Sequence, residues 1–204
     1  VEAFILNYVN HLPENKYTVE LIVMNRTPQY LGEKLKREVK IHYVPERIKN
    51  PLGYNCRVNE IVKKGNYDIL WCNFCTLSDI TWLKAAKKYG IPVRIAHSHN
   101  SENMGNKLVL ISHLQHKKII SKYVTHFFAC SDVAGEFMFG DNIVKQNNYC
   151  LINNAIETDK YSYNENIRMK TRLDLKISDK IVITNVGRFH FQKNHSFLVN
   201  VFSE

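Results

Sequence analysis

Short apolar runs rich in strand-forming residues alternate along this sequence with segments in which apolar residues recur at helical spacing. In the run 68–72, every residue after Asp68 is apolar, which is typical of a strand buried on both faces. The strand-like runs are 18–24, 41–44, 68–72, 92–96, 125–130, 148–152 and 180–186. The helical segments are 1–12, 55–64, 78–89, 106–123, 164–173 and 194–204. Because short connections join these segments, their order predicts an α/β fold with a parallel sheet and helices on both faces.

Residues that start and stop helices support these boundaries. Pro13 cannot continue the first helix, and Gly65 and Gly90 are stop signals for the next two. Ser131 and Asn194 are placed to cap the helices that follow them.

Parallel sheets bind ligands at the carboxyl ends of their strands. The loops of interest therefore follow the last residues of the central strands, which are Cys72, Ala96, Cys130, Ile152 and Val186.

A polar, irregular stretch at 153–166 predicts a linker between two domains. The domains are then 1–152 and 167–204, and the strand-like run 180–186 opens the second. One strand and one partial helix cannot form a core. The end of the chain is therefore expected to pack on the first domain, pair with another chain or fray.

Composition restricts the partners. The net charge of +9 favours an anionic partner, but basic and aromatic residues are not interleaved as a nucleic-acid platform requires, so nucleic acid is not expected. No apolar run is long enough for a transmembrane helix. Five cysteines form an odd set that is too sparse for a disulfide scaffold, and three of them lie in apolar runs as buried thiols do. We expect a reducing, cytoplasmic environment.

The helical segment 106–123 mixes leucine and isoleucine with four lysines and two histidines. One interpretation is a core-facing helix with a solvated basic side. The alternative is peripheral contact with an anionic membrane, where each basic residue adds about 1 kcal/mol.

The segment 186–194 (VGRFHFQKN) gathers four features that bind anions at the end of one predicted strand. Gly187 lets a ligand approach the backbone, Arg188 offers a planar fork, and Lys193 offers a point charge. Asn194 opens a helix whose N-terminus favours negative charge. A basic surface loop is the alternative. The binding interpretation requires that 180–186 lie in a parallel sheet.

His99 follows the predicted strand 92–96, at the edge where ligands bind. An imidazole there can hydrogen-bond a substrate hydroxyl or stabilise developing charge, although a structural loop histidine is the alternative. His97 points to the same side. A zinc site is a further alternative, because Cys72 and Cys75 have C-x2-C spacing and the two histidines end a neighbouring strand.

Several segments in order resemble retaining GT-B glycosyltransferases of the large family 4, of the bacterial capsule and exopolysaccharide type. They are VEAFILNYVNHL, RIAHSHNS, FFACSDVAGEFMFG, LINNAIETDKYSYN and NVGRFHFQKN. The resemblance implies a Rossmann-like acceptor-side domain that lacks its first strand, followed by the start of a donor-binding domain. The sequence is therefore expected to be truncated at both ends, because the family's Gly-Gly loop would precede Val1 and its Glu-x7-Glu helix would follow Glu204.

The resemblance also implies an activity, which is transfer of a sugar from a nucleotide-sugar donor, expected to be UDP-linked, to a saccharide or lipid-linked acceptor. It assigns Gly187, Arg188 and Lys193 to the donor diphosphate, His99 to the transferred sugar, and the residues after it, Asn100 and Ser101, to the acceptor side. No metal or other cofactor is expected. The expected location is the cytoplasm, at the inner face of the cell membrane.

Two rival interpretations remain open. The first is a non-catalytic relative with the same fold that acts as a binding or partner subunit. The second is an unrelated doubly wound nucleotide-binding module, for which the sequence contains no G-x-G-x-x-G or Walker A pattern.

Overall fold

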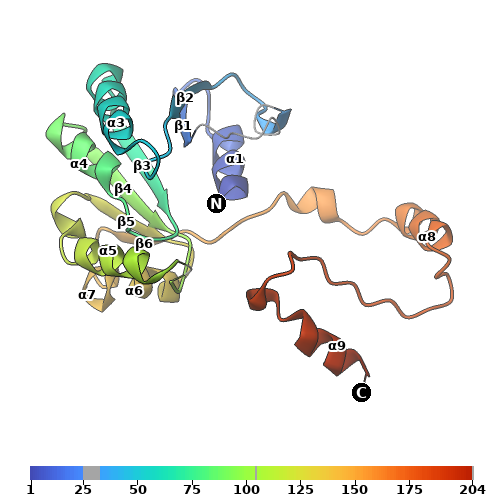
Figure 1. The fold of residues 1–204 in the computed structure, drawn as a ribbon. Coiled ribbons are helices and arrows are strands. Elements are labelled where there is room, and N and C mark those ends of the chain that lie inside the picture. The colour runs from blue at the N-terminus through green and yellow to red at the C-terminus, as the bar shows by residue number, and fades with distance from the viewer. Residues whose placement is uncertain (25–32, 104, 204) are drawn as a thin grey trace. The chain divides into compact units, whose positions relative to one another are not determined.

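The computed structural model describes residues 1–24, 33–103 and 105–203 (Figure 1). The chain forms two compact units, Val1–Ile156 and Glu157–Glu204, and each is described by itself. The predicted α/β fold with parallel strands is confirmed in the first unit.

The strands form two parallel sheets within the described residues. Their bounds are β1 Glu20–Met24, β2 Lys40–Val44, β3 Ile69–Phe74, β4 Val93–Ser98, β5 His126–Ala129 and β6 Tyr149–Leu151. The first sheet pairs β1 with β2, and the second has the order β3-β4-β5-β6. We predicted one sheet, but among the described residues no strand pairing joins β1 to β3.

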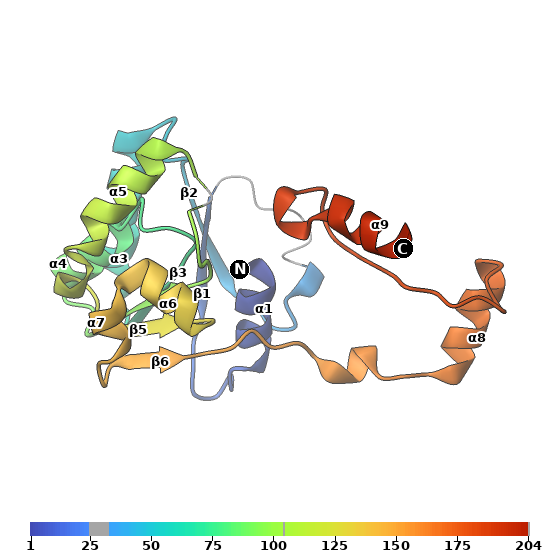
Figure 2. The same cartoon turned by 90° about the horizontal axis from the view of Figure 1, so that it is seen from below.

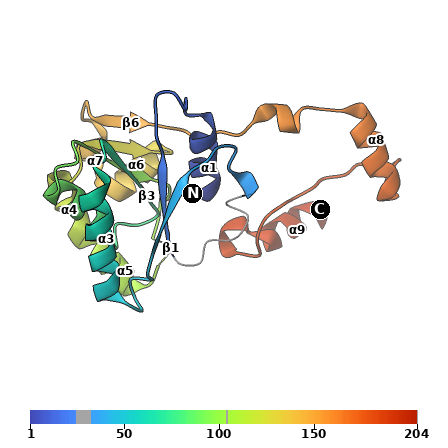
Figure 3. The same ribbon diagram turned by 90° about the horizontal axis from the view of Figure 1, so that it is seen from above.

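Helices follow most of the strands. Their bounds are α1 Glu2–His11, α3 Pro51–Gly65, α4 Thr81–Lys88, α5 Lys107–Lys117, α6 Asp132–Phe139, α7 Asp141–Val144, α8 Glu165–Asp174 and α9 His195–Ser203. Figures 2 and 3 show α1 on one side of the four-stranded sheet and α3, α4, α6 and α7 on the other. This arrangement confirms the prediction of helices on both faces.

The main core lies on the side of α3, α4, α6 and α7. Leu70, Ala96 and Phe127 come from neighbouring strands and are buried against residues such as Leu83 of α4 and Met138 of α6. The opposite face carries Trp71, His97 and Phe128 under α1. The two faces therefore differ, with an aliphatic core on one side and an aromatic cluster on the other.

The first turn of α3 lies upstream of the predicted segment. Asn50 accepts a hydrogen bond from the backbone of Gly53 at 2.8 Å, and Pro51 occupies the first helical position. Both are standard helix starts, but they lie before the apolar periodicity on which the prediction rests. At the other end Gly65 is still helical, and Asn66 takes the left-handed conformation with φ of 45°.

The segment predicted as one helix at 106–123 is divided. The helix α5 begins where predicted, with Asn106 as a cap that accepts from the backbone of Val109 at 3.0 Å, but it ends at Lys117. A 3-10 turn at Ile120–Lys122 follows and buries Ile120. No helix in the described part of the chain is both long and apolar enough to cross a bilayer.

In the second unit, the strand predicted at 180–186 is absent. The segment pairs with no described strand, and its apolar side chains Ile181, Ile183 and Val186 are exposed. An isolated strand leaves its backbone groups without partners, so a β-rich sequence alone does not create a sheet. The predicted helices on either side do form, as α8 and α9. The predicted domain limits 1–152 and 167–204, with the linker 153–166, remain predictions.

All five cysteines are free thiols. The prediction of buried thiols is wrong for Cys150, which is exposed, while Cys72 is partly buried and packs against the core. Cys150 pairs with Phe128 in the ladder and so belongs to the face of the sheet that α1 covers only in part.

Candidate functional site

The candidate site lies at the carboxyl end of β4, which ends at Ser98. His97 is fully buried on the face that α1 covers, and its ring stacks on that of His99 with 4.3 Å between centroids and 26° between planes. Phe4 of α1 meets both rings edge-on, at 4.6 Å and 4.9 Å between centroids. The two histidines therefore point to the same side, as the sequence predicted.

The ring of His99 has one hydrogen-bond partner in the described part of the chain. Its Nε2 lies 2.8 Å from Oδ1 of Asn73, the fifth residue of β3. The register explains the contact, because Asn73 pairs with His97 and the backbone N–H of His99 donates to the carbonyl of Phe74 at 2.9 Å. The sheet itself brings the two side chains together.

Burial controls the charge of both rings. It lowers the pKa of His97 to about 3, with the neighbouring His99 adding to the effect. It also lowers the pKa of His99 to about 4. Both rings are therefore neutral near pH 7, so His99 can exchange hydrogen bonds with a hydroxyl but does not act as a resident cation.

The two residues assigned to the acceptor side follow directly. Asn100 is half-buried and Ser101 is exposed. The hydroxyl of Ser98 lies 2.8 Å from the carbonyl oxygen of Ala134 and 3.3 Å from that of Asn100. The loop after β4 is thus connected to the first turn of α6, and the roles of Asn100 and Ser101 remain predictions.

The predicted diphosphate-binding residues lie near one another within the second unit. A Cβ on Gly187 would lie 3.3 Å from Cγ of Lys193, so the aliphatic part of the lysine passes over the glycine. His195 Nε2 donates to the carbonyl of Arg188 at 2.9 Å, and its Nδ1 accepts from Asn185 at 3.2 Å. These bonds connect the segment before Arg188 to the start of α9. The parallel sheet that the donor-site interpretation requires is not formed by the described residues.

The four side chains of the zinc alternative do not gather. In the part of the chain that the structure describes, no group of three or more histidine, cysteine, aspartate or glutamate residues could hold a metal ion. Cys72 lies on the core face of β3, opposite to the face of His97 and His99. Burial raises the pKa of its thiol to about 12, which disfavours the thiolate that zinc binds.

Sequence reasoning missed three residues of this site, which are Asn73, Trp71 and Phe4. Trp71 stacks on His97 at 5.9 Å, and its indole N–H has no partner among the described residues. Asn73 follows the buried strand core at the edge where ligands bind, so its position was a readable signal. The contact of Phe4 depends on tertiary packing that no local pattern reports.

Comparisons with known proteins agree with this architecture. The sequence model of Glycosyltransferase Family 4 matches residues 1–160. A Bacillus subtilis (strain 168) protein named "Putative glycosyltransferase EpsF" is 27% identical over 209 residues, which cover 98% of this chain and 53% of that protein. The chain thus spans about half the length of this relative. No solved structure shows a significant match. With its α/β architecture and parallel sheets, which fit a Rossmann-like fragment of a GT-B fold, the chain belongs to Glycosyltransferase Family 4.

Proposed function

We propose that this chain takes part in transferring a sugar from a nucleotide-sugar donor, UDP-linked, to a saccharide or lipid-linked acceptor, with retention of anomeric configuration. Family membership and the similarity to a protein named as a putative glycosyltransferase both support glycosyl transfer in general. The observation that carries the proposal is the place of His99, a neutral imidazole at the carboxyl end of a central parallel strand.

The reaction defines what the residues would have to do. The bond between the anomeric carbon and the diphosphate oxygen breaks, and its electron pair leaves with the nucleoside diphosphate. The acceptor oxygen forms the new bond to the anomeric carbon and loses its proton. The charge that develops on the leaving diphosphate needs cationic partners in place beforehand.

Arg188 and Lys193 are the proposed partners of the diphosphate, and this assignment requires that 180–186 pair with a strand outside the described residues. A guanidinium fork and an ammonium group suit phosphate oxygens. The side chain of Lys193 packs over Gly187, so these two residues of the motif lie close together. These cations would do the electrostatic work for which other transferases use a metal ion. His99 would contact a hydroxyl of the transferred sugar, and Asn100 and Ser101 would face the acceptor.

An acceptor carried by lipid would place the enzyme at the cytoplasmic face of the membrane. The helix α5 supports peripheral contact, because Leu108, Ile111 and Leu114 are exposed on it. Exposed lysines flank this stripe at Lys107 and Lys118. An apolar stripe between basic residues is typical of helices that rest on anionic bilayers.

Nucleotide binding tests the donor site. UDP and GDP are titrated calorimetrically into a protein that contains this whole chain, and into its Arg188→Ala and Lys193→Ala variants. We expect tighter binding of UDP, weakened about tenfold or more by either change, since a charge-assisted bond is worth about 1.5–3 kcal/mol. Lys170→Ala, an exposed lysine of α8, is the matched control and should bind normally.

Unchanged affinity in both variants would remove the donor-site assignment. Absence of any nucleotide binding would instead favour the alternative of a non-catalytic binding or partner subunit.

A further inference from the structure

The ring of His99 is held from three directions. Asn73 Oδ1 lies 2.8 Å from its Nε2, the ring of His97 stacks on its face at 4.3 Å, and Phe4 approaches edge-on at 4.9 Å. A ring bonded at one nitrogen and packed between two aromatic neighbours has little rotational freedom. Its second nitrogen, Nδ1, therefore has a defined direction.

The partner of Nε2 determines the tautomer. An amide oxygen can only accept a hydrogen bond, so the nitrogen facing Asn73 Oδ1 carries the hydrogen. In a neutral imidazole the other nitrogen is then an acceptor. The lowered pKa of His99, about 4, keeps the ring neutral. No described residue forms a hydrogen bond with Nδ1.

We propose that Asn73 is a positioning residue that fixes His99 as the Nε2–H tautomer, so that Nδ1 accepts a hydrogen bond from a substrate hydroxyl. The identity of that hydroxyl, on a sugar, rests on the proposed function. The tautomer does not, because it is a property of the chain without substrate.

Asn73 lies on a strand and not in a loop, so the sheet sets its position. It lies on β3 in register with His97 of β4, and Phe74 accepts from the backbone of His99 at 2.9 Å. Side chains on paired strands are held more precisely than side chains on loops. Asn73 is thus placed before any substrate binds.

Nitrogen-15 NMR of the histidine rings in the full chain tests the inference. The signals of His99 are identified by their loss in His99→Gln. We expect Nε2 to show the chemical shift of a protonated nitrogen and Nδ1 that of an unprotonated one. In Asn73→Ala we expect a mixture of tautomers, because the acceptor is gone. Asn103→Ala, in the loop after β4, is the matched control and should keep a single tautomer.

Asn73→Asp gives a second, independent readout. A carboxylate also accepts from Nε2, so the tautomer should be retained, and its negative charge should raise the pKa of His99. The titratable group that faces the ring is His97, and it is unchanged in this variant. Circular dichroism verifies that each variant is folded.

Two kinds of result would overturn the inference, one concerning the tautomer of His99 and one concerning its pKa. One is an Nδ1–H tautomer in the unmodified chain, or the same single tautomer in a folded Asn73→Ala. The other, decisive if Asn73→Ala fails to fold, is a pKa of His99 that does not move in Asn73→Asp. Neither result depends on nucleotide binding, so failure of the glycosyltransferase proposal would be seen separately.

Discussion

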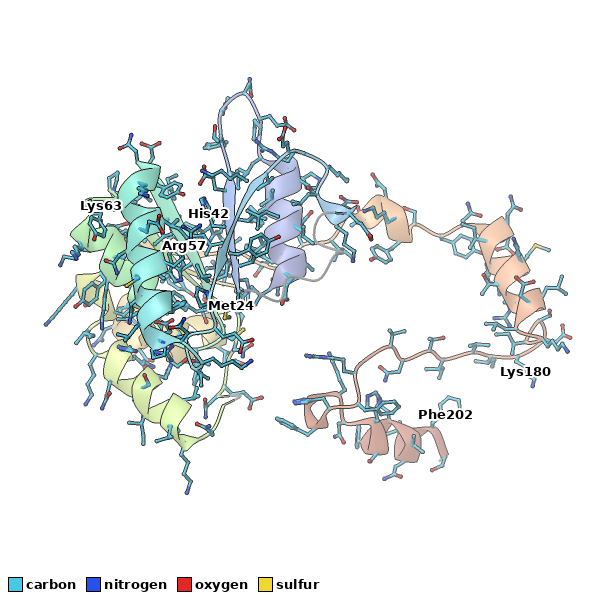
Figure 4. The ribbon with its side chains drawn as sticks, turned by 45° about the horizontal axis from the view of Figure 1, so that its top comes forward. Met24, His42, Arg57, Lys63, Lys180 and Phe202 are labelled. Carbon is cyan, nitrogen blue, oxygen red and sulfur yellow. The ribbon has the colours of Figure 1, made fainter. Side chains whose placement is uncertain are left out.

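The hydroxyl of Tyr67 donates a 2.5 Å hydrogen bond to the carboxylate of Glu20. Tyr67 lies just before β3, and Glu20 is the first residue of β1, so this contact joins two sheets that no strand pairing connects among the described residues. His42 and Lys40 of β2 bond the same carboxylate, at 2.5 Å and 3.0 Å; Figure 4 labels His42 on its strand. Although burial opposes it, these bonds hold the pKa of Glu20 at about 2.

The first prediction concerns this contact between the sheets. Tyr67→Phe should lower the free energy of unfolding by about 1–2 kcal/mol, because it removes a hydrogen bond to a charged group that is only partly screened. Urea denaturation at pH 7 measures the change. Tyr43→Phe, at an exposed tyrosine of β2, should change the same quantity by less than about 0.5 kcal/mol. Equal effects in the two variants would contradict the special role of Tyr67.

The second prediction is a loss of stability in mild acid. The folded-state pKa of His97, about 3, lies below the ordinary value of 6.5. The unfolded chain therefore binds the proton first, so this contribution to stability is complete above pH 6.5 and is lost as the pH falls toward 3. We expect the unfolding free energy to decline between pH 6.5 and pH 5, with His97 contributing up to about 1.4 kcal/mol per pH unit.

His97→Phe isolates this contribution. The aromatic ring is retained, and two buried nitrogens without partners among the described residues are removed, so stability near pH 7 should be kept. The slope in mild acid should become smaller but persist, because His99 and His113 also have lowered pKa values. Glu20 does not contribute to this slope, because the stability that its lowered pKa provides is lost only as the pH falls below 4.5. Urea melts from pH 7 to pH 5 provide the measurement, and an unchanged slope would contradict the assignment.

The sequence correctly predicted features that depend on neighbouring residues in the chain, such as strand preference and helix caps. β3 and the cap at Ser131 form where expected, with Ser131 accepting from the backbone of Ala134 at 3.2 Å. The segment 180–186 has the same residue preferences as β3 but forms no strand, because a strand also needs a neighbour and periodicity says nothing about neighbours.

The candidate site was likewise predictable only in part. His99 could be found because it follows a strand, and ligands bind at strand ends. Asn73 could not be paired with it from sequence, since the contact depends on the β3–β4 register. The low pKa values of the histidines likewise come from burial, to which Phe4 of α1, far away in the chain, contributes by packing against both rings.

The third prediction concerns a close approach between α6 and β6. A Cβ on Gly135 would lie 2.5 Å from the hydroxyl of Tyr149, which is buried without a partner in the described residues. Gly135→Ala should destabilise the protein by about 1–3 kcal/mol because of overpacking, although alanine has the better helix propensity. Tyr149→Phe alone should be nearly neutral, since it removes a buried hydroxyl that pairs with nothing described.

The double variant tests the cause. Gly135→Ala with Tyr149→Phe should recover part of the lost stability and no more, because two ring carbons of Tyr149 remain 3.0 Å from the new methyl group. The coupling energy from the four urea melts should be about 0.5–3 kcal/mol. Strictly additive effects would show that Gly135→Ala acts elsewhere.

The last prediction concerns α5 and the membrane. The chain should bind vesicles that contain anionic lipid and should bind neutral vesicles weakly, because both charge and apolar area contribute. Replacing Leu108, Ile111 and Leu114 by serine should weaken binding about tenfold or more, as burying even one such side chain is worth about 1.5–3 kcal/mol. Lys107→Glu with Lys118→Glu should have a similar effect, at about 1 kcal/mol for each charge removed from the anionic surface.

A matched pair of exposed apolar residues serves as the control for vesicle binding. Ile48 and Leu52 are exposed at 92% and 78% and belong to the segment that leads into α3 and to its first turn, outside α5, so serine at both positions should leave binding unchanged. Vesicle co-sedimentation at low and moderate salt measures all variants. Equal binding to neutral and anionic vesicles would contradict the electrostatic contribution, and equal losses in the control and α5 variants would show that α5 is not the contact surface. Either result would leave an acceptor that is not embedded in lipid as the better substrate for this family member.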